Sequence, residues 1–497
     1  MAKLIRSWGL LFLSVWLIAA SGVAAQTPAA EPVEVRVMTF NIWVGGELVD
    51  LGQVVEAIRA ADADVVLLQE AGGNSRLIAE LLGWPHASER MQVISRLPLI
   101  DPEGADGNYI LVQTGPGQVF AVTNVHLPSD PYGPYLIRDG LALDEVLQNE
   151  ADTRVPGIEA HLAALTGLLA EGMPVVLGGD FNSPSHQDWT AAAIAGRPEA
   201  RYPVQWPVTQ AVEAAGLVDT YRVVHPDPVS QPGITWTYGY PYPRLRAGEV
   251  LDRIDFLFAS SAIEIVNSHI VGPGGSANAD IPITPYPSDH RAVAATLRLT
   301  PVEPPLFTSL DRRVVQAGDP IVVRYHVPVG EASDRIFILP ADAALTEETP
   351  LMSLPPMEAD FFGAVTFGSA TLAPGAYDAV GSSGDLAEYA RARFWVVAPG
   401  SLPVVRTDQA DYASGEPVEV SWDSFSGNRW DWIAVYAAGD ADLTNYLAYV
   451  YTGSASSGRT TLDADVLGEL APGDYVVRLM QDDWYSVMAE APFRVRE

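Results

Sequence analysis

The chain contains no cysteine, so it forms no disulfide bond and offers no thiol to a metal ion or a lipid anchor. Lysine is almost missing too, because Lys3 is the only one in 497 residues. Acidic residues dominate, with 62 Asp and Glu against 29 Lys and Arg, and the net charge is −33. This charge repels polyanions at long range, and no cluster of basic residues indicates a nucleic-acid groove.

The first 25 residues have the pattern of a signal peptide. Lys3 and Arg6 precede an apolar stretch over residues 10–20, and small residues follow it at 23–25. A membrane anchor is the competing interpretation, but the apolar stretch is short for a span. We therefore expect cleavage before Gln26, a secreted or periplasmic protein, and no transmembrane segment in the mature chain.

A length of 497 residues and a hydrophobic fraction of 48% predict several folded domains rather than a disordered chain. Residues 33–299 alternate short apolar runs with helical patterns, as in a layered α/β domain. The clearest helix is predicted over 156–170, where Ile158, Leu162, Leu165 and Leu169 share one face.

Beyond a proline-rich linker at residues 300–306 the pattern becomes β only, and it repeats. "AGDPIVV" at 317–323 parallels "SGEPVEV" at 414–420, and "LAPGAY" at 372–377 parallels "LAPGDY" at 470–475. Two units of this size, with short alternating strands and Pro-Gly turns, predict immunoglobulin-like β-sandwiches. We place them at residues 305–398 and 403–497.

Polar side chains stand at the ends of several predicted strands of the first domain. Functional groups of layered α/β domains gather where strands leave the sheet. Any one of these groups alone could close a turn or simply be a solvated surface side chain. Six strand ends, however, carry a carboxylate, an amide or an imidazole. The candidates are Asn41, Glu70, His126, Asp180, Asn182, Asp255, Asp289 and His290.

This set, in this order, resembles the endonuclease/exonuclease/phosphatase superfamily of DNase I-like metal-dependent phosphoesterases. "GDFN" at 179–182 and "SDH" at 288–290 carry most of the resemblance, which covers about residues 33–299. It implies a four-layer α/β sandwich as the catalytic domain, followed here by the two all-β sandwiches.

The resemblance also implies roles for the residues. Glu70 would be the main metal ligand, with Asn41 and Asp289 beside it. Such oxygen ligands suit Mg²⁺, with Mn²⁺ or Ca²⁺ as alternatives.

The remaining candidates would be catalytic. Asp180 would orient or deprotonate the attacking water, and Asn182 would bond to the phosphoryl oxygen. His290 would act on a proton at the phosphate, with its tautomer fixed by Asp255, and His126 would donate to the transition state. Asp252 competes with Asp255, but we interpret Asp252 as a surface group or a partner of Arg253.

One departure from the family pattern concerns the phosphate side. Family nucleases place a tyrosine and an arginine there, but no tyrosine stands just before the "SR-P" element at 95–98. Arg96 is therefore interpreted as structural, with Tyr109 and Arg138 as conceivable substitutes.

Two loops rich in proline and aromatic residues, at 127–140 and 235–248, flank the predicted site. They either stiffen themselves by packing rings on prolines or bind substrate through stacking and cation contacts. The substrate-binding candidates are Tyr132, Tyr135, Arg138, Trp236 and Tyr238.

We therefore expect a secreted, divalent-metal-dependent hydrolase of phosphodiesters or phosphomonoesters. The acidic surface favours a small-molecule or lipid head-group substrate over nucleic acid. The alternatives are a secreted nuclease acting on DNA or RNA and a non-catalytic binding protein on the same fold. The C-terminal domains could contact glycan or an envelope surface, and the oligomeric state is left open.

Overall fold

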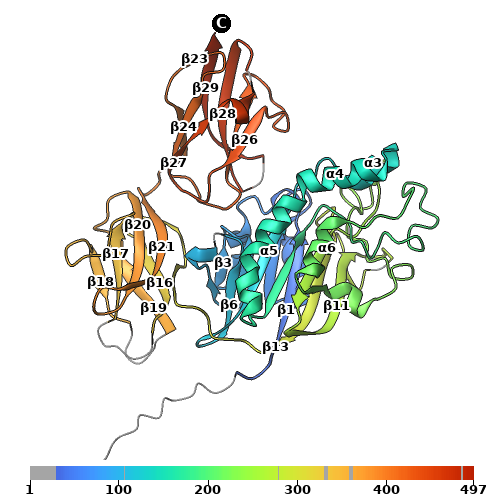
Figure 1. Cartoon of the computed structure of the whole chain (residues 1–497), viewed down its shortest axis with the longest axis horizontal. Helices are drawn as coiled ribbons and strands as arrows, with labels where there is room; N and C mark the ends of the chain where they lie inside the picture. The colour runs from blue at the N-terminus through green and yellow to red at the C-terminus, as the bar shows by residue number, and fades with distance from the viewer. Residues whose placement is uncertain are drawn as a thin grey trace, which may run out of the picture.

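The computed structural model describes residues 30–496, except for 106, 278, 329–333, 357–361, 469 and 483–484. The predicted signal peptide lies outside these residues. Figure 1 shows an α/β domain from the N-terminal part of the chain, joined to two separate β-sandwiches. Within the described part, no helix is both long and apolar enough to cross a bilayer.

The α/β domain contains two mixed sheets. The first sheet has seven strands in the order β12 (Ile281–Ile283), β11 (Ile263–Pro273), β13 (Ala292–Leu299), β1 (Val33–Asn41), β2 (Val65–Gln69), β4 (Val93–Ser95) and β3 (His86–Ser88). The second has six, in the order β5 (Leu99–Ile100), β6 (Ile110–Gly115), β7 (Gln118–His126), β8 (Val175–Asp180), β10 (Asp255–Ser260) and β9 (Leu217–Asp219).

The two sheets pack face to face around one apolar core. Val37 of β1 and Leu67 of β2 meet Phe120 of β7, Val176 of β8 and Leu257 of β10 in this core, and all five are buried. β1 and β2 are buried on both faces, which explains why they read as continuous apolar runs in the sequence.

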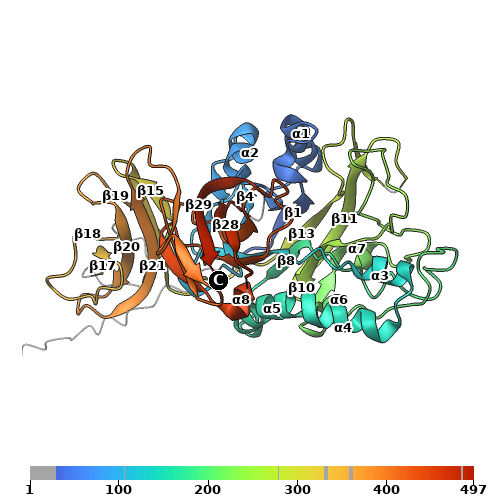
Figure 2. The same ribbon diagram turned by 90° about the horizontal axis from the view of Figure 1, so that it is seen from above.

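Helices cover the outer face of each sheet, and Figure 2 shows them on opposite sides of the domain. The first sheet carries α1 (Leu51–Ala61) and α2 (Ser75–Leu82). The other helices of this domain are α3 (Gly133–Asp139), α4 (Leu143–Thr153), α5 (Val155–Ala170), α6 (Pro207–Ala214) and α7 (Thr220–Val224), with 3₁₀ turns η1 (Val44–Gly46) and η2 (Glu103–Ala105). The result is the expected four-layer α/β sandwich.

The predicted helix is α5, which packs on the second sheet through Ile158 and Leu165. His161 and Leu168 are buried on the same side, so the buried stripe is rotated slightly from the predicted one. Helix periodicity of 3.6 residues places these positions next to the expected Leu162 and Leu169, which are partly buried.

Each C-terminal domain is an all-β sandwich of two sheets. The first contains β14 (Phe307–Leu310), β16 (Pro320–His326) and β19 (Phe362–Gly368) opposite β15 (Val314–Gln316), β21 (Glu388–Val397), β20 (Gly375–Ser382), β17 (Arg335–Pro340) and β18 (Met352–Leu354). The second contains β22 (Val404–Thr407), β24 (Val418–Asp423) and β27 (Gly458–Leu462) opposite β23 (Asp411–Ala413), β29 (Val487–Arg496), β28 (Gly473–Met480), β25 (Trp432–Ala437) and β26 (Ala448–Tyr451), with a short helix α8 (Ala464–Leu467). The same strand arrangement in both explains the sequence repeat.

Both sandwiches contact the α/β domain through buried polar groups. Asp101 receives two hydrogen bonds from Arg90, at 2.8 and 2.9 Å, and pairs with Arg313 of the first sandwich at 3.2 Å. Arg429 of the C-terminal sandwich donates to His161 of α5 at 3.1 Å. Figure 1 shows this sandwich above the α/β domain.

Candidate functional site

The predicted site residues converge because neighbouring strands of each sheet end or begin at one edge. His126 ends β7 and stands opposite Asp180, the last residue of β8, while Asp255 begins the antiparallel β10 and also stands opposite Asp180. In the other sheet, Asn41 ends β1, and Glu70 directly follows β2. The site therefore forms at one end of the domain, where these strand ends of both sheets lie next to each other.

Asn41 joins the two sheets across this edge. Its side-chain amide donates to Glu70 Oε1 at 3.1 Å and to Asp180 Oδ2 at 3.0 Å, and the residue is fully buried. Its side-chain oxygen Oδ1 accepts from the backbone N–H of Trp43 at 3.0 Å. Asn41 thus holds two carboxylates close together, and direct ligation of a metal by its oxygen stays a prediction.

Glu70 and Asp289 form an acidic pair at one side of the site. Glu70 has a left-handed backbone (φ 55°) and its Oε2 accepts from the backbone N–H of Val44 at 3.0 Å. Burial, with a further contribution from the charge of Glu70, raises the pKa of Asp289 to about 7 despite the opposing effect of His290. Asp289 Oδ1 is buried and has no hydrogen-bond partner among the described residues.

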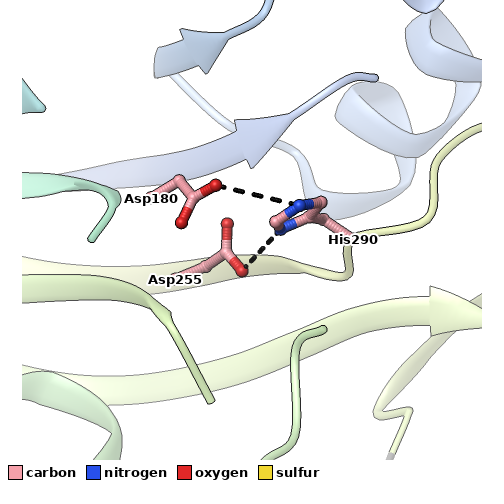
Figure 3. A group of neighbouring side chains, drawn as sticks. All are labelled: Asp180, Asp255 and His290. Carbon is pink, nitrogen blue, oxygen red and sulfur yellow. Dashed lines mark hydrogen bonds and ion pairs between the residues drawn. The ribbon is translucent and has the colours of Figure 1, made fainter. Parts of the chain in front are cut away.

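His290 lies between two carboxylates, as Figure 3 shows. Its Nδ1 is 3.0 Å from Asp255 Oδ2, and its Nε2 is 3.7 Å from Asp180 Oδ2. Burial alone would lower the pKa of His290, but Asp255 and Asp180 outweigh it and raise that pKa to about 10. The two carboxylates therefore favour the protonated form of the ring, which can donate a proton from Nε2.

Asp180 is the centre of the catalytic candidates. Its Oδ1 accepts from the backbone N–H of Asn182 at 2.9 Å, and its Oδ2 lies 3.7 Å from His126 Nε2. Asn182 has a left-handed backbone (φ 48°), and its side-chain amide donates to the Leu127 carbonyl at 2.9 Å. The turn after β8 therefore points both polar side chains of "GDFN" into the site.

A cleft of about 350 Å³ adjoins this centre. Asn182 lines it together with four predicted substrate-binding residues, namely Tyr132, Tyr135, Arg138 and Trp236. The Trp236 ring centroid lies 6.2 Å from that of His290, so the aromatic wall extends to the catalytic histidine candidate. Tyr238 is placed differently, because its ring packs beneath the guanidinium of Arg291 at 3.3 Å.

The cleft also contains residues that were not among the predicted site residues. Arg246 stacks over Tyr240 at 4.1 Å, and Glu249 accepts a hydrogen bond from the Tyr135 hydroxyl. The aromatic and basic composition of loop 235–248 was the available signal for Tyr240 and Arg246. Glu249 follows that loop and gave no comparable signal.

The interpretation of Asp252 was wrong. Asp252 is buried and accepts from Tyr132 at 3.2 Å, from Trp189 at 2.9 Å and from Arg197 at 3.0 Å. It supports the cleft wall from behind. Arg253 pairs instead with Asp188 and Asp219.

Arg96 has the structural role that was expected. It pairs with Asp62 and Asp64, both at 3.1 Å, and stacks on Trp84.

Comparison with known proteins identifies the family of the α/β domain. The sequence profile of the Endonuclease/Exonuclease/phosphatase family matches residues 38–290. The chain belongs to this family. An uncharacterized protein of Caenorhabditis elegans is 32% identical over 293 residues, which cover 52% of this chain and 90% of the relative.

Solved structures that match the chain do so at low sequence identity and with low TM-scores. An endonuclease/exonuclease/phosphatase from Beutenbergia cavernae is 18% identical, covers 73% of this chain and 99% of its own, and has a TM-score of 0.35. An AP endonuclease from Archaeoglobus fulgidus is 17% identical, with coverages of 52% and 98% and a TM-score of 0.33. A mannosyl-6-phosphatase from Bacteroides thetaiotaomicron is 13% identical, with coverages of 53% and 99% and a TM-score of 0.28.

Family members are phosphoesterase hydrolases and generally use a divalent metal ion, and two groups of side chains in the site offer donor atoms for one. Glu70 and Asp289 provide adjacent carboxylates, one with a buried oxygen that lacks a hydrogen bond among the described residues. Asp180, Asp255 and His290 also offer ligand atoms within 4.8 Å of one another. A hard cation fits the first group well, because its oxygens are the ligands that Mg²⁺ prefers.

Proposed function

We propose that the chain is a divalent-metal-dependent phosphoesterase whose cation binds at Glu70 and Asp289. The carrying observation is a buried Asp180–His290–Asp255 constellation directly beside this acidic pair. Asp180 and Asp255 favour the protonated form of His290, and a protonated ring nitrogen does not ligate a metal. The metal is therefore assigned to Glu70 and Asp289, with Mg²⁺ preferred and Mn²⁺ or Ca²⁺ as substitutes.

The bound cation would supply electrostatic stabilisation of charge on the phosphoryl oxygens. Asp180 would orient the attacking water and take its proton, because its carboxylate is held by Asn41 and Asn182. His290 would donate its Nε2 proton at the reacting phosphate, while Asp255 accepts from Nδ1 and keeps the ring in place. His126, which also lies beside Asp180, would donate a hydrogen bond to the phosphoryl group in the transition state.

The cleft supports a small phosphoester or a lipid head group as substrate. Its volume of about 350 Å³ and its aromatic wall suit one ring or head group. Arg138 and Arg246 line it and can bind a second anionic group. A net charge of −33 works against long-range attraction of a nucleic acid.

Hydrolysis assays test this proposal. We expect Mg²⁺-dependent release of p-nitrophenol from bis-p-nitrophenyl phosphate, abolished by EDTA, and a loss of about 10²- to 10⁴-fold in kcat for His290→Ala. His269→Ala is the matched control, because the His269 side chain is partly exposed on β11 and pairs only with Asp280 at 4.0 Å among the ion pairs of the described residues. Equal turnover by His290→Ala and the wild type would refute the catalytic assignment.

A substrate panel separates the remaining alternatives. Sphingomyelin, p-nitrophenyl phosphate and plasmid DNA are compared at equal Mg²⁺ and two salt concentrations. The proposal predicts that a small ester or lipid is hydrolysed faster than DNA. Preferential DNA cleavage that weakens with salt would favour a nuclease, and no hydrolysis of any ester would favour a binding protein.

We also propose that the protein is exported, which the charged, apolar and small-residue order of residues 1–25 supports. N-terminal sequencing of protein recovered from the medium or periplasm should begin at Gln26. Recovery of an intact N-terminus from the cytoplasm would contradict this proposal.

A further inference from the structure

The loop that carries Glu70 is held by a residue of the C-terminal sandwich more than 400 positions away. This Glu70 loop, residues 70–73, has left-handed backbone angles at Glu70 (55°), Gly72 (57°) and Gly73 (86°). Such a backbone costs free energy at a residue with a side chain, so Glu70 needs external support to keep its carboxylate in place.

Gln92 provides the first part of this support. Its Oε1 accepts from the Ala71 backbone N–H at 3.0 Å, and its backbone carbonyl accepts from the Leu68 N–H at 2.9 Å. Gln92 is buried, so its side-chain amide also needs an acceptor.

Asp482 of the C-terminal sandwich provides that acceptor. Its Oδ1 accepts from Gln92 Nε2 at 2.7 Å, and its Oδ2 accepts from the Gly73 backbone N–H at 2.9 Å. The Asp482 carboxylate therefore binds the Glu70 loop directly at Gly73, and it supports Ala71 indirectly through Gln92. Both contacts are short, fully buried on the Asp482 side and charge-assisted.

The sandwich in turn fixes Asp482. Its backbone N–H donates to Asp431 Oδ1 at 3.1 Å, and Asp431 Oδ2 accepts from Ser426 and from the Asn428 backbone, both at 2.8 Å. The adjacent Gln481 packs so closely on Gly73 that a Cβ there would lie 2.9 Å from its Nε2. The two domains therefore make a close-packed, hydrogen-bonded contact at this point.

We propose that Asp482 is a positioning residue for the metal site: the C-terminal sandwich sets the Glu70 loop in its metal-binding conformation through the Asp482–Gln92 pair. This inference rests on the proposed metal-dependent function. It gives the third domain an indirect part in metal binding, through the backbone of the Glu70 loop.

The test is a Mn²⁺ titration of the metal-free full-length protein by isothermal calorimetry. Asp482→Asn keeps the shape of the side chain but turns an N–H toward Gln92 or Gly73. Because supporting residues around metal ligands contribute 10- to 100-fold to affinity, we expect the Mn²⁺ Kd to rise by about tenfold or more. Gln92→Met breaks the same connection from the catalytic domain and should give a similar rise, which keeps the test decisive if Asp482→Asn folds poorly.

Arg429→Met is the matched control, because Arg429 crosses the same domain boundary but contacts Asn108 and His161 instead of the Glu70 loop. Its Mn²⁺ Kd should stay within about twofold of the wild type. In hydrolysis assays, the Mn²⁺ concentration for half-maximal rate should rise for Asp482→Asn, while kcat at saturating Mn²⁺ largely recovers.

The outcomes are separable. A wild-type Kd in Asp482→Asn and Gln92→Met, or an equal loss of affinity in Arg429→Met, would overturn the positioning role alone. A wild-type protein that binds no Mn²⁺ would overturn the proposed function and this inference with it.

Discussion

At the scale of single residues, the site is built from carboxylates whose charges are incompletely balanced by the protein. Asn41 bridges Glu70 and Asp180 with one amide group, and His290 balances Asp180 and Asp255. Asp289 is left with a buried oxygen that has no hydrogen-bond partner among the described residues. This imbalance is the physical reason for assigning a cation to the acidic pair.

The raised pKa of Asp289 predicts that metal binding depends on pH. Only the carboxylate form binds a cation, and its pKa in the metal-free protein is about 7. Below this value a proton competes with the metal, so the apparent Mn²⁺ Kd should rise by about tenfold for each pH unit. Calorimetric titrations between pH 5.5 and 8 measure the slope. Asp289→Asn should bind weakly with a much flatter profile, and a flat wild-type profile would contradict the prediction.

Residue chemistry made much of this edge predictable from the sequence. A carboxylate after an apolar run is costly unless it is paired, and this reasoning favoured a metal-binding role for Glu70. It failed at Asp252, whose partners Trp189 and Arg197 lie in an irregular segment that no periodicity describes. It could not find Asp482, because the Gln92 contact spans 390 residues.

At the scale of elements, β8 shows why two glycines precede Asp180. Gly179 has a left-handed φ of 147°, and a Cβ there would lie 1.9 Å from the Val125 carbonyl of β7. A Cβ at Gly178 would lie 2.5 Å from a methyl group of Leu257. The glycines therefore allow the neighbouring strands to approach closely, which brings His126 and Asp255 beside Asp180.

Gly179→Ala is expected to destabilise the fold by about 3 kcal/mol or more, because the added methyl group overlaps backbone that cannot rotate away. Gly167→Ala in α5 is the control, since no atom lies within 4 Å of its added Cβ. That change should stabilise the protein by up to about 1 kcal/mol through higher helix propensity. Urea unfolding of the two variants measures both effects, and equal midpoints would refute this account of β8.

The elements themselves were largely predictable, because strands and helix follow the periods of their buried faces. The apolar runs became β1, β2, β7 and β8, and the β-only repeat became two sandwiches. The packing of one sheet on the other was taken from family resemblance alone, since no local pattern specifies which strands from distant segments face each other.

At the scale of the whole molecule, buried ion pairs join the domains. Asp101 lies between Arg90 of the α/β domain and Arg313 of the first sandwich. The Ser309 hydroxyl oxygen accepts a hydrogen bond from the Asp101 backbone N–H at 2.9 Å. Burial would raise the pKa of Asp101, but the two arginines outweigh it and lower that pKa below its usual value. The carboxylate therefore stabilises the folded protein above its unfolded pKa, and this stability is lost as pH falls through the folded pKa.

Asp101→Ala should weaken this junction strongly. It leaves the buried guanidiniums of Arg90 and Arg313 without their shared carboxylate, a loss of about 3 to 5 kcal/mol for buried pairs of this kind. We expect faster proteolysis of the linker at residues 300–306 and a lower Tm at pH 7, with a smaller difference from the wild type at acidic pH. Arg459→Ala, which removes an exposed pair with Glu419, is the control and should leave both unchanged. Wild-type proteolysis of Asp101→Ala would refute the role of this pair.

The Asp482 contact has a consequence for engineering. A chimaera that places the C-terminal sandwich on another α/β domain transfers Asp482 without its partners Gln92 and Gly73. Unless the recipient also carries a glutamine at the position of Gln92 and a glycine at that of Gly73, the graft brings a buried, unmatched carboxylate to the loop that should bind the metal. In a chimaera, the α/β domain and the C-terminal sandwich should therefore be transferred together.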